Sequence, residues 1–149
     1  MRRIMLAMAA LSLPVAASTA GLVALAGPAG ASAPVSCTKV SGTATGTLTF
    51  KGCGGGLGKG TGPAAALSST GTITWKGKHK GTTTITITSV TTPTVSRCAT
   101  GSTEFDATGS VTGDTSGKVT VGSAVSGDAC VSAAGAVSLV KHTVFTLQS

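Results

Sequence analysis

Few residues of this chain could act as acids, bases or nucleophiles. The 149-residue sequence has four acidic residues, two histidines and no Tyr. Glu104 and Asp106 are two apart in a predicted strand, about 6.5 to 7 Å on one face, which suits acid–base glycoside chemistry or a calcium site. His79 lies in a lysine-rich turn that disfavours its protonation, and His142 has no identifiable acidic neighbour. We therefore predict a solvated acidic pair, no metal or cofactor, and no enzymatic activity.

The cysteines are the next candidates for chemistry: Cys37, Cys53, Cys98 and Cys130. Their even number predicts two disulfides in an exported protein, and no pair has the Cys-x-x-Cys spacing of a small zinc site. The pairing stays open. If SGTATG (41–46) is a turn, Cys37 and Cys53 meet at the mouth of a hairpin. If the strand is continuous, they lie about 50 Å apart, too far for a disulfide.

Positive charge is concentrated in the first half of the chain. Residues 32–97 contain seven basic residues and no acid, and all four acids follow. The segment WKGKHKG places four basic side chains around a predicted hairpin tip: Lys76, Lys78, His79 and Lys80. Such a tip could contact an anionic cell-envelope polymer or a lipid surface, or it could be a solvated turn that protects a sheet edge. We expect no specific nucleic-acid binding, because Trp75 falls on the inward face without a second aromatic side chain beside it.

The glycine-rich run GCGGGLGKGTG (52–62) invites comparison with a phosphate-binding loop. It fails the G-x-x-x-x-G-K-[ST] pattern at both ends, since Cys53 occupies the first glycine position and Gly60 the Ser/Thr position. We interpret the run as a flexible loop.

Alternation of apolar and threonine residues predicts the strands that position these side chains. The stretch TGTLTFKG (45–52) returns as TGTITWKG (70–77). In both copies the aliphatic and aromatic residues fall on one face while Thr and Lys fall on the other, as in a half-buried strand. The same alternation predicts further inward residues: Ile85, Ile87, Phe105, Ala107, Val111, Val119, Val121, Val137, Leu139, Phe145 and Leu147.

Two irregularities are expected in these strands. Lys141 interrupts the inward face of the last strand, which predicts a bulge near Lys141 or His142. Glycines also fall at inward positions, where they permit tight coiling or close approach of a neighbour: Gly42, Gly46, Gly71 and Gly109.

The pattern as a whole predicts an all-β domain. No ten-residue run has helical periodicity, and turn signals separate short strands at regular spacing. We expect a single antiparallel β-sandwich or flattened barrel of about seven to eight strands, with the choice between the two left open. Because the chain has one Trp and three Phe, its core is thin, and disulfides worth roughly 2 to 4 kcal/mol each would matter.

The amino-terminal residues read as a targeting segment. Arg2 and Arg3 precede a long apolar run that ends in small residues, so residues 1–31 are predicted to be a cleaved signal peptide. Pro34 makes a cut after residue 33 unfavourable. The alternative, an uncleaved membrane anchor, fits the length of the run but not its Pro14. Cleavage leaves residues 32–149 as one secreted domain and, by removing two arginines, lowers the formal charge from +7 to +5.

The two repeated stretches share the pattern G-T-x-T-F/W-x-G, and in this the chain resembles small Thr/Gly-rich exported all-β proteins of actinobacteria. The resemblance implies compartment and architecture, and no site residue. Our first functional expectation is a secreted, non-enzymatic β-domain that associates with the cell envelope or another anionic surface through its basic half. One alternative is an apolar-ligand carrier whose interior is lined by Leu48, Phe50, Ile73 and Trp75. Another is a secreted enzyme inhibitor, and the oligomeric state stays open.

Overall fold

The computed structural model describes residues 33–148, so the predicted signal peptide lies outside the described residues. The strands are β1 (Val35–Thr43), β2 (Thr47–Cys53), β3 (Gly58–Pro63), β4 (Thr70–Lys76), β5 (Lys80–Thr91), β6 (Ser102–Asp114), β7 (Ala124–Ser132), β8 (Ala136–Leu139) and β9 (Phe145–Leu147). One short 3-10 helix, η1 (Ala64–Leu67), joins β3 to β4. Within these residues, no helix has the length and apolar character needed to cross a membrane.

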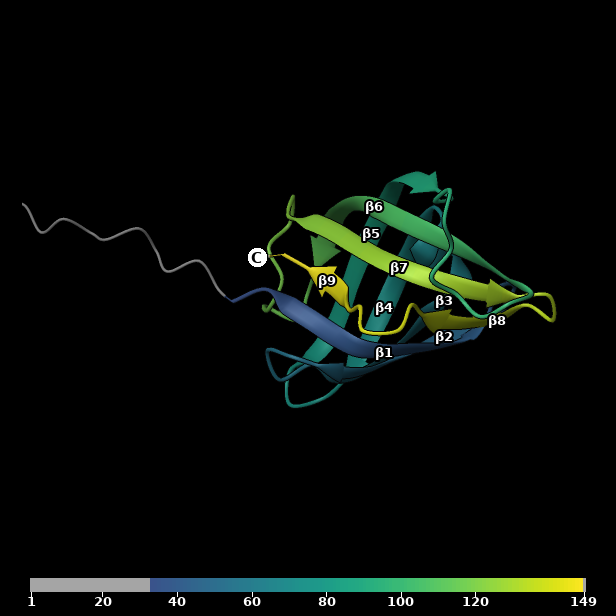
Figure 1. Cartoon of the computed structure of the whole chain (residues 1–149). Helices are drawn as coiled ribbons and strands as arrows, with labels where there is room; N and C mark the ends of the chain where they lie inside the picture. Colours follow the sequence, from purple (N-terminus) through teal and green to yellow (C-terminus); the bar gives the residue numbers. More distant parts are fainter. Residues whose placement is uncertain (1–32, 149) are drawn as a thin grey trace, which may run out of the picture.

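The strands form one closed antiparallel barrel (Figure 1). From β1 to β7, each strand pairs with the next one along the chain. Both β8 and β9 pair with β7 on one side and β1 on the other. Because β8 and β9 contact different parts of those two neighbours, together they fill the eighth position and close the ring. The all-β prediction is confirmed, and the structure is a barrel rather than a sandwich.

The interruption predicted near Lys141 and His142 is a loop. Residues 140–144 leave the sheet between β8 and β9, and His142 has a positive φ of 67°. Val140 stays buried and donates its N–H to the carbonyl of Asp128 at 3.0 Å. The residues after it turn outward, so both Lys141 and His142 are exposed.

Both predicted disulfides are confirmed. A turn follows β1, so Cys37 lies directly opposite Cys53 across β1 and β2, with their Cα atoms 3.9 Å apart. The continuous-strand alternative is therefore wrong, and Gly46 lies in that turn. Cys98 pairs with Cys130 and fastens the β5–β6 loop (92–101) to β7. Two disulfides are typical of an oxidising, extracellular compartment.

The interpretation of residues 52–62 as a flexible loop is wrong, because the run contains the end of β2 and all of β3 except Pro63. Gly60 faces the barrel interior, where an added Cβ would lie 2.5 Å from the ring of Trp75. A strand whose inward positions are glycine has no apolar residues for an alternation pattern to detect. The space inside the barrel next to β3 is filled instead by side chains from the neighbouring strands.

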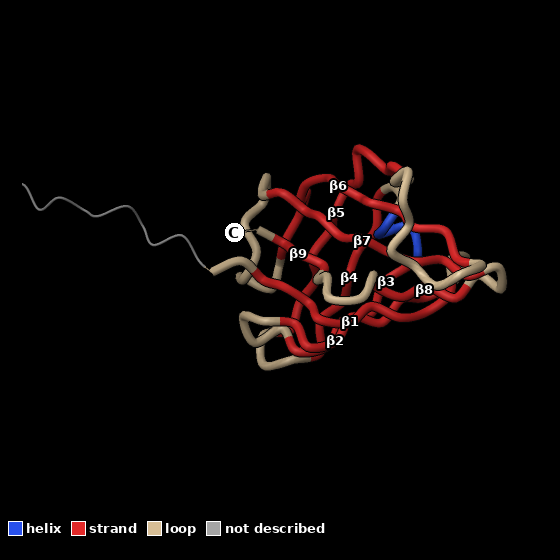
Figure 2. The backbone as a smooth tube through the Cα atoms, viewed as in Figure 1, coloured by secondary structure: helices blue, strands red, loops and turns tan. Residues whose placement is uncertain are grey.

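Elsewhere the predicted faces are mostly correct, with one clear error. Val121 is 58% exposed, because residues 115–123 form the irregular β6–β7 connection rather than a strand. Gly71 gives the close approach expected of inward glycines, since an added Cβ would lie 2.6 Å from the backbone nitrogen of Ala66 in η1. Figure 2 shows η1 in blue, at the end of the barrel away from the C-terminus.

The repeated stretch now has a structural explanation. Its two copies form β2 and β4, which flank β3, so Phe50 and Trp75 both lie opposite Gly60. Their rings meet edge to face with centroids 6.3 Å apart, and Phe50 also contacts Phe145 at 5.2 Å. Edge-to-face aromatic pairs of this kind add to the stability gained by burial. The repeat therefore packs one half of the barrel around a glycine.

Candidate functional site

Five lysines form a row across the outer face of β1 to β5. In the sheet register Lys39 is opposite Lys51, Lys51 is opposite Lys59, and Lys76 is opposite Lys80. The β3–β4 register, extended by one residue, places Lys59 opposite Lys76. All five side chains are exposed. Because neighbouring strands lie about 4.8 Å apart, this lysine row follows the curved barrel surface for about 19 Å.

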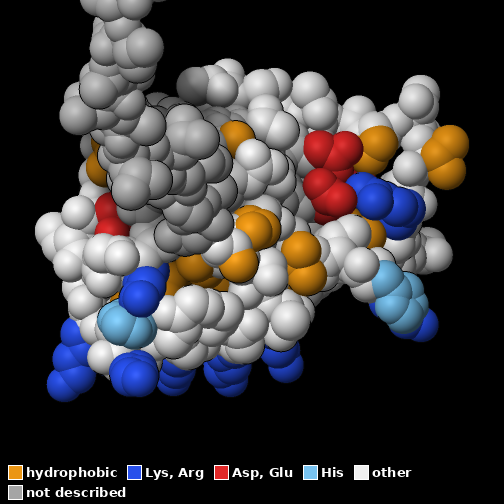
Figure 3. Space-filling model, turned by 90° about the vertical axis from the view of Figure 1, so that its left-hand side faces the viewer, with side chains coloured by type: hydrophobic (Ala, Val, Ile, Leu, Met, Phe, Trp, Pro, Cys, Tyr) orange, Lys and Arg blue, Asp and Glu red, His pale blue; other side chains and the backbone are white. Residues whose placement is uncertain are grey.

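Other basic groups lie close to the lysine row. Lys78 and His79 occupy the β4–β5 turn, where His79 donates its backbone N–H to Gly56 at 3.1 Å. Burial, followed by the charges of Lys118 and Lys78, lowers the pKa of His79. The direction agrees with the expectation from the sequence, but burial and Lys118, which lies outside the turn, are larger causes than the turn lysine Lys78. Figure 3 shows blue side chains gathered along the lower edge of this end of the molecule.

A second row, of hydroxyl side chains, runs beside the lysine row. Each member lies two residues from the lysine of its own strand, after it in β1, β3 and β5 and before it in β2 and β4, and therefore on the same outer face. Its members face one another in register: Ser41, Thr49, Thr61, Thr74 and Thr82. Hydroxyl groups both donate and accept hydrogen bonds, so the surface alternates a line of cations with a line of neutral polar groups.

The lysine row is not neutralised within the described residues. The salt bridges of residues 33–148 all involve Arg97, and none involves a lysine of the row. Like charges directly opposite each other destabilise a sheet. Protection of a sheet edge does not account for the lysines, because β4 and β5 are paired on both sides and the barrel is closed. The row costs stability without a structural role in view.

Three of the four acidic residues form a separate cluster around Arg97. The Arg97 guanidinium contacts Glu104, and its Nη2 lies 3.1 Å from Asp128 and 3.4 Å from Asp106. The Glu104 side chain is fully buried, so the prediction of a solvated pair is wrong for it. The disulfide-fastened β5–β6 loop folds back over β6, the strand that follows it, and covers the carboxylate, a contact that alternation along a strand does not reveal.

This cluster has opposite effects on two carboxyl groups. Hydrogen bonds from the Arg97 backbone and guanidinium lower the pKa of Glu104. Burial, then the charges of Asp128 and Glu104, raise the pKa of Asp106. Because one guanidinium holds all three carboxylates, the arrangement fits a structural anchor for the loop. No group of three or more His, Cys, Asp or Glu side chains in residues 33–148 is placed so that it could hold a metal ion.

A buried polar network fixes the aromatic half of the interior. The Trp75 indole donates to the Thr83 hydroxyl at 2.8 Å, which donates in turn to Asp114 at 2.6 Å. Ser116 and the backbone of Gly117 also donate to this carboxylate. Burial alone would raise the pKa of Asp114, but these hydrogen bonds outweigh it and hold the pKa below its usual value. Trp75 is 2% exposed and is locked in an inward orientation.

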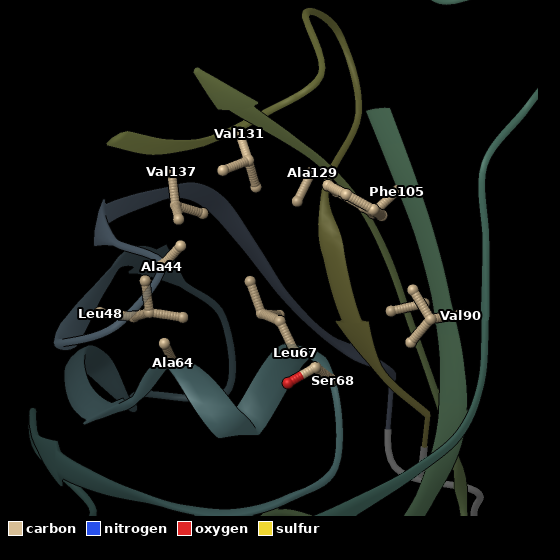
Figure 4. Close-up of a pocket in the computed structure, with 11 residues that line it drawn as sticks. Ala44, Leu48, Ala64, Leu67, Ser68, Val90, Phe105, Ala129, Val131 and Val137 are labelled. Atoms are coloured by element: carbon tan, nitrogen blue, oxygen red, sulfur yellow. The ribbon is translucent and has the colours of Figure 1, made fainter. Parts of the chain in front are cut away.

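The other half of the barrel contains an apolar cavity of about 280 Å³ (Figure 4). Its lining comes from the β1–β2 turn, η1 and the strands around them: Ala44, Leu48, Ala64, Leu67, Ser68, Val90, Phe105, Ala107, Ala129, Val131 and Val137. Of the four residues predicted to line a ligand interior, Leu48 is part of this cavity. Phe50, Ile73 and Trp75 instead belong to the packed core.

Sequence reasoning missed parts of both features. Lys39, Lys51 and Lys59 were counted among the basic residues but not placed beside the β4–β5 turn. The signal was present, because Lys51 and Lys76 occupy the same position in the two repeats. For the cavity the available signal was weaker: Ala107 and Ala129 are small residues at inward strand positions.

Comparison with known protein families, with curated proteins and with solved structures found no match. The fold therefore defines the class of the chain, which is a closed antiparallel β-barrel with two disulfides. The resemblance to exported actinobacterial proteins stays a prediction.

Proposed function

We propose that this protein is a secreted, non-enzymatic β-barrel that binds an anionic polymer of the cell envelope along the lysine row. The observation that carries the proposal is the register of Lys39, Lys51, Lys59, Lys76 and Lys80, five cations opposite one another without an acid between them. The repulsion within this row is offset when a polyanion lies along it. Binding of an anion thus explains why the chain has a row of lysines that repel one another in the free protein.

The shape of the row favours a polymer over a flat lipid surface. The lysines lie on five successive strands of an eight-position barrel, so the row bends around the surface. A flexible chain of charged units can follow that curve, whereas a bilayer would contact a part of it. The neighbouring hydroxyl row supplies hydrogen bonds to phosphate or sugar oxygens.

Export of the chain is part of this proposal. It is supported by the two disulfides, which suit an oxidising compartment, and by the predicted signal peptide at residues 1–31. A polyanion of the envelope is then the anionic partner that the protein would meet in quantity.

The test is binding of the disulfide-bonded protein to a glycerol-phosphate polymer, measured at low and at high salt. We expect Lys51→Gln, at the centre of the β1–β3 part of the row, to weaken binding about fivefold, since one lysine near an anionic surface contributes about 1 kcal/mol. The matched control is Lys141→Gln, which removes the same charge from the exposed β8–β9 loop and should change binding little.

Several outcomes would count against the proposal. Equal weakening by both substitutions would mean that net charge alone acts, and binding that persists at high salt would exclude an electrostatic row. Tight binding to phosphatidylglycerol vesicles with none to the polymer would replace the polymer by a lipid surface. No binding to either would overturn the proposed function.

A further inference from the structure

We infer that the apolar cavity is a binding site for one medium-length hydrocarbon chain, such as the acyl or alkyl chain of a small amphiphile. This site is inside the barrel and involves none of the residues of the lysine row. The inference is therefore independent of the proposed function.

The chemistry of the lining selects an apolar guest. Ten of the eleven lining residues have side chains made of carbon and hydrogen alone, and the exception is Ser68. Figure 4 shows the Ser68 hydroxyl beside the cavity, next to Leu67 and across from Val90. Among the lining residues, Ala44 and Ser68 are exposed and Val90 is 42% exposed, so the cavity opens to solvent at this end of the barrel. A ligand with a long apolar part and one polar end group at the mouth matches this distribution.

The hollow results from the choice of side chains rather than from barrel geometry. Its wall carries four alanines, Ala44, Ala64, Ala107 and Ala129, whereas the other half of the same barrel is filled by Trp75 and two Phe rings. Protein interiors are ordinarily packed with few voids. Larger aliphatic residues at the alanine positions would close the cavity, and the chain does not use them.

The volume sets the size of the guest. A water molecule takes about 30 Å³ in the liquid and a methylene group is of similar size, so a cavity of about 280 Å³ holds about nine such groups. The cavity is closed toward the opposite end by the packed aromatic residues. A hydrocarbon chain can thus enter at the η1 end and extend inward as far as Leu48, which belongs to both the cavity lining and the packed core.

The test is a series of straight-chain primary alcohols from butanol to dodecanol, which vary the chain without adding charge. Affinity should rise about fourfold with each methylene, which corresponds to about 0.8 kcal/mol, and level off near nine carbons. Methyl NMR shifts should move at Leu67, Val131 and Val137, which line the cavity, and stay fixed at Val35 and Val119, which do not.

Two adjacent alanines in η1 provide matched variants. Ala64→Leu adds a side chain at a lining position and should weaken decanol binding at least tenfold, whereas Ala65→Leu, one residue along and outside the lining, should retain it. Equal effects of the two would overturn the site, as would an absence of saturable binding to the unsubstituted protein. Tighter binding of adamantanol than of decanol would refute a chain and indicate a compact ring. Because the NMR mapping uses the unsubstituted protein, it decides the matter even if Ala64→Leu fails to fold.

Discussion

Reversal of one charge in the lysine row should stabilise the protein while it weakens polyanion binding. Lys51 lies between Lys39 and Lys59 on the two neighbouring strands. Their flexible ammonium groups can separate to about 7 Å, where two unit charges repel by about 0.6 kcal/mol in water. Screening at physiological salt reduces this to about 0.25 kcal/mol for each pair.

Lys51→Glu converts both repulsions into attractions of the same size. The gain in the free energy of unfolding is therefore about 1 kcal/mol at physiological salt and about 2 kcal/mol at 0.01 M salt. For a domain of this length, about 1 kcal/mol raises Tm by roughly 4 °C. Over the same change, polymer affinity should fall about 25-fold, because two units of charge are lost at about fivefold each.

Thermal unfolding at the two salt concentrations and polymer binding provide the assay, with Lys141→Glu as a control of equal charge change in the β8–β9 loop. General damage to the fold would lower both stability and binding, so opposite signs identify the electrostatic cause. A lower Tm for Lys51→Glu, or a gain that does not shrink with added salt, would refute the reasoning about the row.

Three further predictions concern the scaffold. Gly60→Ala should cost about 1 to 3 kcal/mol in urea unfolding, because its Cβ would lie 2.5 Å from the Trp75 ring, whereas Gly113→Ala, with nothing nearer than 3.6 Å, should be tolerated. Loss of the Cys98–Cys130 bridge, which spans 32 residues, should cost roughly 4 kcal/mol by the loop-entropy estimate, measured with a double Ser variant. Arg97 lowers the pKa of Glu104. The interaction between the two side chains therefore stabilises the fold above pH about 4.3, and this stabilisation is lost as pH falls. Arg97→Gln should then lower Tm at neutral pH and flatten its decline in acid.

The prediction of faces from alternation worked where inward positions carry large apolar residues. Ile73, Trp75, Ile85 and Phe145 are all buried as expected. It failed at β3, whose inward positions are glycines and whose burial comes from the Trp75 ring of a neighbouring strand. It also failed for Glu104, because the side chain does point out of the barrel but another segment covers it.

For the candidate sites, the sequence indicated a basic half and an apolar interior. It did not indicate which lysines lie side by side or where the cavity lies. Lys51 and Lys76 were visible as equivalent positions of a repeat, yet Lys39 and Lys59 join them through strand register alone. A slip of one residue in that register would turn those side chains to the other face. The cavity was placed too deep, among Phe50, Ile73 and Trp75, because inward direction does not reveal which inward groups fill the space.

The sequence by itself determined the all-β class, the wet and dry faces of most strands and the number of disulfides, because each of these depends on residue type and spacing along the chain. The tertiary structure alone decided which lysines lie side by side, which carboxylate is covered and where the barrel is hollow. Those properties depend on register, ring closure and the volume left between side chains from distant strands. Each of these properties depends on residues that are neighbours in space but not in sequence, so the sequence alone does not show them.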